Sequence, residues 1–238
     1  MKTPQQKICI ALDVDDANRA LELIDQLKSH VGLFKVGMQL FYRYGPELVQ
    51  EMVSRGAKIF LDLKFHDIPN TVKNASIAAV RMKVAIFNVH AGGGLSMMQQ
   101  AVAGAKEAAQ KEGFPLPQII GVTILTSLTQ EMLSNELNLP GTLESRVVKL
   151  AKLSKTAGLD GVVASPHELE LIQSTCGSDF TIITPGIRPL WAVSNDQKRI
   201  MTPKAAIEKG ANYIVVGRPI IQADDPALAV CRLFENSL

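Results

Sequence analysis

Residues 58–71 of this chain read KIFLDLKFHDIPNT, an apolar run that passes directly into two acids placed around one lysine. In a β-strand, side chains two positions apart share a face, so Asp62 and Lys64 project together while Leu63 points to the other side. Asp67 falls in the loop that follows. Charges at the end of an apolar strand must be solvated or paired. The stretch therefore predicts a strand that ends either in a prepared charged site or in a solvated ion-pair cluster.

Outward from this stretch, β-branched apolar runs alternate with segments of helical period along the whole chain. The first helical segment places one apolar stripe at Ala17, Ala20, Leu21, Ile24 and Leu27. About eight βα units fit the sequence, which predicts an α/β fold, a single (β/α)8 TIM barrel, with residues 1–238 in one domain. We expect its strands at residues 8–14, 33–37, 58–64, 85–91, 118–125, 161–165, 181–185 and 213–217.

An open doubly wound sheet is the structural competitor of the barrel. That fold binds nucleotides through a glycine-rich turn after its first strand. Here the first expected strand runs instead into Leu12, Asp13, Val14 and two further aspartates. No linker, low-complexity tract or charge run divides the chain, so one closed barrel is the favoured architecture.

Charge and composition limit the classes of partner. The chain has 238 residues, of which 47% are hydrophobic, enough for one large core. With 25 basic and 23 acidic residues, its net charge of +2 does not favour nucleic acid or an anionic membrane as a partner. Any anionic ligand must therefore be held by local geometry.

The cysteines and the N-terminal segment indicate a cytoplasmic protein. Cys9, Cys176 and Cys231 are odd in number, widely separated and without metal-site spacing, so we expect reduced thiols. The first apolar run is broken at Asp13, which makes it too short for a secretory core or a membrane span.

In a TIM barrel the chemistry belongs at the carboxyl ends of the strands, and polar groups gather there in this sequence. Lys35 is the most informative, because a charge inside a short apolar strand is costly unless an acid pairs with it. Asp62 on the neighbouring strand is within reach, so Lys35 belongs either to a functional site or to a structural ion pair. The polar groups at the other strand ends are Asp13, Thr126, Arg188 and Arg218.

Three further features have both a functional and a simpler interpretation. Gly217 and Arg218 stand where such barrels hold phosphate, but they also suit a helix-opening turn. The polar loop at residues 189–200 is either a lid or a merely mobile loop. His66 and His90 border the charged segment, and a supporting role or a tight turn explains them more simply than acid–base chemistry.

Several motifs together carry a family resemblance. Segment 62–71, with LDV at 12–14, FKVG at 34–37, TPGIR at 184–188 and VGRPI at 216–220, closely resembles the orotidine 5'-phosphate decarboxylase family. The motifs follow the family order over nearly the whole chain. The resemblance implies a stand-alone, homodimeric barrel that converts orotidine 5'-phosphate to uridine 5'-phosphate and carbon dioxide, the last step of pyrimidine nucleotide synthesis. It also implies that neither a metal nor an organic cofactor takes part.

The resemblance assigns roles to individual residues. Lys35, Asp62, Lys64 and Asp67 match the charged catalytic network, in which Lys64 stabilises the carbanion at C6 and protonates it. Asp67, Ile68 and Thr71 match residues that reach into the partner subunit's site. Ribose contacts fall on Asp13 and Thr71, the base-edge contact on Thr126 or its neighbour Ser127, and the phosphate and lid contacts on Arg188, Gln197, Gly217 and Arg218.

Two rival functions remain at the level of sequence. A metal-dependent sugar-phosphate decarboxylase or aldolase of the same suprafamily shares the Asp-x-Lys-x-x-Asp segment, but carries a glutamate where this chain has Lys35, and a lysine there would repel a divalent cation. A non-catalytic module that binds nucleotide phosphates would keep Gly217 and Arg218. It would not need two lysines alternating with acids.

Overall fold

The computed structural model describes residues 3–192 and 201–235 of the chain. Eight parallel strands close into a barrel in sequence order, with β8 paired back onto β1. The predicted (β/α)8 barrel is confirmed, and the open doubly wound sheet is excluded because a closed sheet leaves no edge strand. The strands are β1 (Ile8–Ala11), β2 (Leu33–Gly37), β3 (Ile59–Phe65), β4 (Ile86–His90), β5 (Gln118–Val122), β6 (Gly161–Val163), β7 (Thr181–Thr184) and β8 (Tyr213–Val216).

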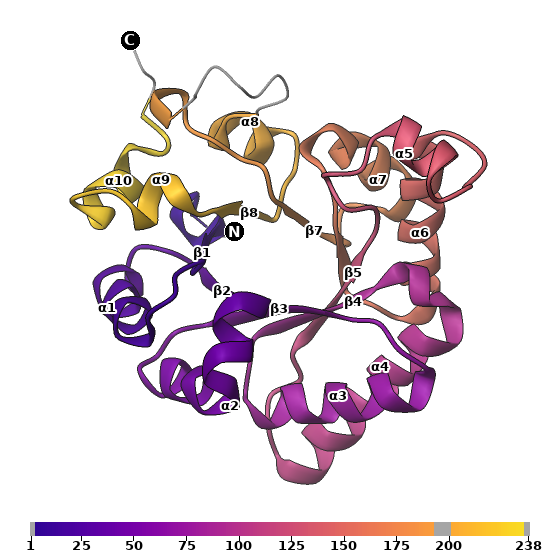
Figure 1. Ribbon diagram of the computed structural model, residues 1–238, viewed down its shortest axis with the longest axis horizontal. Coiled ribbons are helices and arrows are strands. Elements are labelled where there is room, and N and C mark those ends of the chain that lie inside the picture. Colours follow the sequence, from indigo (N-terminus) through magenta and orange to yellow (C-terminus); the bar gives the residue numbers. More distant parts are fainter. Residues whose placement is uncertain (1–2, 193–200, 236–238) are drawn as a thin grey trace.

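The helices form an outer ring around the strands, as Figure 1 shows. In α1 the predicted stripe is confirmed, because Ala20, Leu21, Ile24 and Leu27 are buried and Ala17 packs against the core. Within the described ranges, no helix combines the length and the apolar content that crossing a membrane requires. The helices are α1 (Ala17–Leu27), α2 (Met38–Ser54), α3 (Pro69–Arg81), α4 (Gly94–Glu112), α5 (Gln130–Asn135), α6 (Leu143–Ala157), α7 (Leu169–Cys176), α8 (Pro203–Glu208), α9 (Arg218–Ile221) and α10 (Pro226–Arg232).

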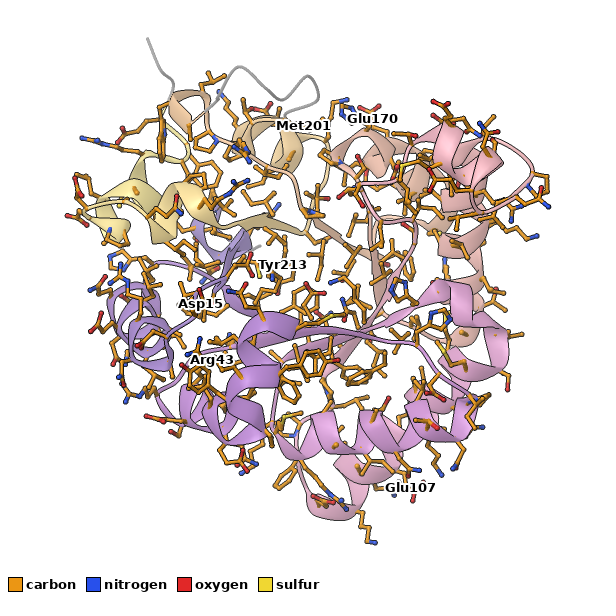
Figure 2. The ribbon with its side chains drawn as sticks, viewed as in Figure 1. Asp15, Arg43, Glu107, Glu170, Met201 and Tyr213 are labelled. Atoms are coloured by element: carbon orange, nitrogen blue, oxygen red, sulfur yellow. The ribbon has the colours of Figure 1, made fainter. Side chains whose placement is uncertain are left out.

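Strand alternation divides the core into two parts. On β3, Ile59 and Leu61 belong to the large cluster between strands and helices, while Phe60 belongs to a smaller cluster inside the barrel. Figure 2 labels Tyr213, another member of the inner cluster, near the middle of the ring. The inner cluster fills the interior of the barrel. The polar side chains of the strands gather beyond it, at the carboxyl ends of the strands. Its buried members are Cys9, Leu33, Phe60, Ile86, Ile120, Ile183 and Tyr213.

Most strands end earlier than their apolar runs. The expected first strand extends to residue 14, but β1 stops at Ala11, and β5 stops at Val122 rather than at residue 125. Leu12, Val14 and Ile124 nevertheless pack against the outer core. Apolar runs therefore overestimate strand length here, because the first loop residues are also covered by the barrel.

Candidate active site

Four charged side chains alternate in sign across the carboxyl end of the barrel. Asp13 follows β1, Lys35 lies on β2, and Asp62 and Lys64 lie on β3. The Lys35 Nζ lies 3.0 Å from Asp13 Oδ1 and 3.6 Å from Asp62 Oδ2. The Lys64 Nζ lies 2.7 Å from Asp62 Oδ1. Asp62 therefore bridges two ammonium groups.

Strand pairing explains how these side chains meet. Lys35 pairs with Ala11 on β1, and Asp62 pairs with Gly37 on β2, so neighbouring strands deliver their charges to one level. Gly37 leaves room for the ammonium group, since a Cβ there would lie 3.1 Å from Lys35 Nζ. Leu63 points into the outer core, as the alternation predicted.

Burial separates this network from a surface ion-pair cluster. The side chains of Lys35 and Asp62 are only 12% and 13% exposed, so their mutual attraction is weakly screened by water. Burial by itself lowers the pKa of Lys35, but the carboxylates of Asp62 and Asp13 outweigh it and raise the pKa above its usual value. Lys35 therefore stays charged at neutral pH.

A cavity of about 210 Å³ opens beside this network. Lys35, Asp62 and Lys64 form its charged wall, which faces apolar side chains from β5, β6 and β8. Thr126 is among the lining residues, and Ser127 is not. A charged wall opposite an apolar wall suits a flat, polar ring with one reacting edge. The remaining lining residues are Phe60, Val122, Ile124, Leu125, Val163, Pro185 and Val215.

Three predicted site residues lie apart from this cavity in the single chain. Asp67 is exposed, and its Oδ1 accepts a hydrogen bond from the backbone N–H of Ile68 at 2.6 Å. Ile68 is 67% exposed, and Thr71 lies exposed in the first turn of α3. Among the described ion pairs, none joins Asp67 to Lys64. In the single chain these three residues are therefore exposed rather than part of the cavity wall.

The residues predicted to hold phosphate follow β7 and β8. Gly217 lies against the end of β1, because a Cβ there would be 3.4 Å from Ala11 Cβ. Arg218 begins α9 and is exposed. The backbone N–H of Arg188 donates to the carbonyl of Met201, which Figure 2 labels, at 3.2 Å. Gln197 and most of the proposed lid, residues 193–200, lie outside the described residues.

Sequence reasoning missed Asn88 on β4. Its side chain is fully buried, donates from Nδ2 to Asp62 Oδ1 at 2.7 Å, and accepts the backbone N–H of Lys64 at 2.8 Å. The signal was an amide inside the apolar run IFNVH, two residues after Ile86 and therefore on the inner face of the barrel.

Two histidines border the network without joining it by hydrogen bonds. The ring of His90 lies 5.3 Å from that of His66, measured between centroids. Burial, and then the nearby His66 and Lys64, lower the pKa of His90. In the described part of the chain, no three His, Cys, Asp or Glu side chains are grouped to hold a metal ion.

The comparisons with known proteins agree with this geometry. Residues 6–233 match the model of the "Orotidine 5'-phosphate decarboxylase / HUMPS family". The chain belongs to this family. An orotidine 5'-phosphate decarboxylase from Heliobacterium modesticaldum is 48% identical over 232 residues, covering 98% of this chain and 96% of that protein. Another, from Syntrophotalea carbinolica, is 50% identical over 233 residues, covering 98% and 95%.

A solved structure of the family has the same fold. The crystal structure of orotidine 5'-phosphate decarboxylase from Lactobacillus acidophilus superposes with a TM-score of 0.84 at 39% identity. The superposition covers 95% of this chain and 96% of the Lactobacillus acidophilus chain. The resemblance drawn from the sequence motifs is thereby confirmed at the level of the family, over nearly the whole barrel.

Proposed function

We propose that this chain decarboxylates orotidine 5'-phosphate to uridine 5'-phosphate, the last step of pyrimidine nucleotide synthesis, with protein side chains alone. The observation that carries the proposal is the partly buried Lys35–Asp62–Lys64 array on the wall of the cavity. Membership of the family, and about half identity with proteins named for this activity, support it.

The chemical task is to stabilise charge that appears only in the transition state. When the bond from C6 to the carboxylate breaks, carbon dioxide leaves and the electron pair stays on C6 with little delocalisation. An ammonium group beside C6 favours that charge more than it favours the substrate, which is the condition for catalysis. Lys64 is the proposed group, and Asp62 holds its Nζ at 2.7 Å.

The proton balance closes through the same side chain. The C6 electron pair takes a proton from Lys64 Nζ, which gives uridine 5'-phosphate and a neutral amine. The amine then regains a proton from solvent.

Opposite charges at about 4 Å interact by roughly 4 kcal/mol in a partly screened site, which corresponds to about three powers of ten in rate. Other contacts must supply the rest.

Binding of the remote phosphate is the proposed source of much of that remainder. Arg188, Gln197, Gly217 and Arg218 are assigned to the phosphate and the lid, because guanidinium and backbone N–H groups suit its oxygens. Energy from these contacts can orient the ring and exclude water from the cavity. Asp13 is assigned to the ribose and Thr126 to the base edge, and Thr126 lines the cavity.

We further propose that the active unit is a homodimer with shared sites. Asp67, Ile68 and Thr71 are exposed in the single chain, which suits residues that act in the partner's site. Apolar side chains that follow the two strands flanking β3 are also exposed: Met38 and Tyr42 in α2 and Leu95 in α4 are 40%, 76% and 37% exposed. Exposed apolar side chains of this kind favour association.

Lys35 argues against the metal-dependent branch of the family. Its charged Nζ lies between Asp13 and Asp62, at the position where a divalent cation would need carboxylate ligands. The non-catalytic alternative leaves the two partly buried lysines, Lys35 and Lys64, without a purpose. We also place the protein in the cytoplasm, which its three free cysteines support.

Ultraviolet absorbance tests the reaction directly. Purified protein in excess chelator should consume orotidine 5'-phosphate, and Lys64→Ala should lose at least about a thousandfold in kcat, because its ammonium no longer faces the charge on C6. Lys58→Ala is the control, because Lys58 is exposed just before the opposite end of β3. Consumption only after a divalent metal and a sugar phosphate are supplied would move the assignment to the metal-dependent branch.

Subunit mixing tests the shared site. Lys64→Ala and Asp67→Ala are each expected to be inactive as homodimers. A heterodimer of the two contains one site with both native residues, so an equal mixture should recover about one quarter of the wild-type activity. If subunit exchange is confirmed by mass spectrometry and activity stays absent, the two residues do not serve one site across an interface.

A further inference from the structure

Asn88 occupies an unusual position for an amide side chain. Among the described residues, it is the only asparagine or glutamine that is buried, and its exposure is 0%. It lies on β4 next to β3, with apolar Ile120 as its pairing partner on β5. Buried amides need partners for both donor and acceptor. Both partners of Asn88 belong to the proposed catalytic pair.

The acceptor side of Asn88 compensates for an interruption in the sheet. Leu61 pairs with Phe87, and Phe65 pairs with Val89. Between these two pairs β3 advances by four residues while β4 advances by two, so β3 contains a bulge. Lys64 lies inside this bulge with φ of +52°, a left-handed conformation that non-glycine residues rarely adopt. Its backbone N–H donates to Asn88 Oδ1 at 2.8 Å instead of to a strand carbonyl. The amide therefore supports the backbone turn that carries Lys64.

The donor side of Asn88 fixes the carboxylate that faces Lys64. Its Nδ2 donates to Asp62 Oδ1 at 2.7 Å, the same oxygen that accepts from Lys64 Nζ at 2.7 Å. Because Oδ1 of the amide is held by the Lys64 N–H, the orientation of Nδ2 toward Asp62 follows. One side chain thus sets both the backbone of the lysine and the oxygen that directs its ammonium group.

We propose that Asn88 is the positioning residue of the Asp62–Lys64 pair, an inference that rests on the proposed decarboxylase function. Asn88 acts through these two residues rather than on the substrate. It is not among the residues that line the cavity. Its removal should lower the rate of the chemical step more than it weakens binding.

Two substitutions at this position separate the two hydrogen bonds. Asn88→Ala removes both of them. Asn88→Asp keeps an acceptor for the Lys64 N–H but turns a second carboxylate toward Asp62. Each should lower kcat by about a hundredfold at pH 8, and leave KM and the Kd for uridine 5'-phosphate within about threefold. Ser154→Ala, which alters another fully buried polar side chain in the outer layer, should keep wild-type kinetics.

The pH profile distinguishes positioning from general damage. The charged and titratable groups near Asn88 are Asp62 and Lys64 on β3, Lys35 on β2 and His90 on β4, with His66 against His90. In Asn88→Asp the new carboxyl can donate to Asp62 only when protonated, so kcat relative to wild type should rise as the pH falls from 8 to 5. Asn88→Ala, which has no proton to regain, should show no such recovery.

Each outcome has one meaning. If the wild-type protein does not decarboxylate orotidine 5'-phosphate, the proposed function fails. If the wild type is active and both variants keep kcat within threefold, the inference about Asn88 is wrong. Equal losses in kcat and in product affinity also overturn it, because they indicate a collapsed site. Thermal melts identify folded variants, and Asn88→Asp, which preserves the shape of asparagine, carries the test if Asn88→Ala does not fold.

Discussion

At the scale of single residues, the site depends on charged side chains whose removal from water costs free energy. A buried ammonium such as that of Lys35 has a desolvation penalty of several kcal/mol, which only well-placed partners offset. Asp13 and Asp62 supply them at 3.0 and 3.6 Å. The ammonium group of Lys35 also needs space, which the absence of a Cβ at Gly37 provides.

Gly37→Ala tests that requirement. Its φ of −92° is open to alanine, so the effect is steric rather than conformational. The added Cβ would lie 3.1 Å from Lys35 Nζ and 3.7 Å from Asp13 Oδ1, and the ammonium must move by a few tenths of an ångström. We expect kcat/KM to fall by about tenfold, which corresponds to about 1.4 kcal/mol of lost transition-state stabilisation. Steady-state kinetics measure it.

A second glycine at the same end of the barrel provides the control. Gly92 has open space where a Cβ would lie, and its φ is outside the left-handed region. Gly92→Ala should therefore stay within about twofold of wild type. Equal rates for the two variants would show that the position of the Lys35 ammonium tolerates displacement.

The same scale shows what the sequence can and cannot predict. Lys35 and the Asp62–Lys64 pair stand out because a charge is conspicuous in an apolar strand, and strand periodicity alone places them on one face. Asn88 is visible as an amide inside an apolar strand, but its partners are not, because they are created by the bulge in β3, which nothing in the β4 sequence signals. A contact that depends on an irregularity in another strand requires coordinates.

At the scale of elements, the strand order was predictable and the strand ends were not. Alternation of apolar faces identifies each strand, but covered loop residues such as Leu12 extend the apolar run beyond the ladder. The turn after β6 shows another limit. There Ser165 and Glu168 form a capping box, in which the Ser165 N–H donates to Glu168 Oε2 at 2.9 Å. The sequence pattern suggests the cap but not its burial.

Burial of that cap predicts a pH-dependent stability. Desolvation, only partly offset by the Ser165 N–H, raises the pKa of Glu168 from 4.5 to about 7. The folded state then binds a proton more tightly than the unfolded state. Stability from this group is complete below pH 4.5 and is lost as the pH rises to about 7, by up to about 3 kcal/mol.

Glu168→Gln should remove this dependence while keeping an oxygen for the Ser165 N–H. Between pH 5 and 8 the melting temperature of the variant should rise relative to wild type, as calorimetry at several pH values can measure. Glu170→Gln is the control, because that side chain is 72% exposed and pairs only at the surface with Lys209. Parallel curves for wild type and Glu168→Gln would contradict the assigned burial effect.

At the scale of the whole molecule, one side of the barrel mouth combines exposed apolar side chains with predicted site residues that do not line the cavity. Met38, Tyr42, Ile68 and Leu95 lie in the segments that follow β2, β3 and β4, and their apolar side chains are exposed. Asp67 and Thr71 lie exposed on the same side. If Asp67 and Thr71 serve a neighbouring site, as we propose, a second copy related by a twofold axis would also cover these apolar side chains.

Tyr42→Asp tests this assembly without altering any residue assigned to the site. Tyr42 is 76% exposed in the single chain, so a charge there should leave the fold intact and disfavour only a covered apolar interface. We expect sedimentation velocity to show mainly monomer at micromolar concentration, and kcat to fall with dilution as shared sites come apart. Leu171→Asp is the control, because Leu171 is 38% exposed on α7, across the ring from α2 in Figure 1. A monomeric Tyr42→Asp variant with full activity would show that each barrel holds a complete site and that Asp67 and Thr71 do not act across an interface.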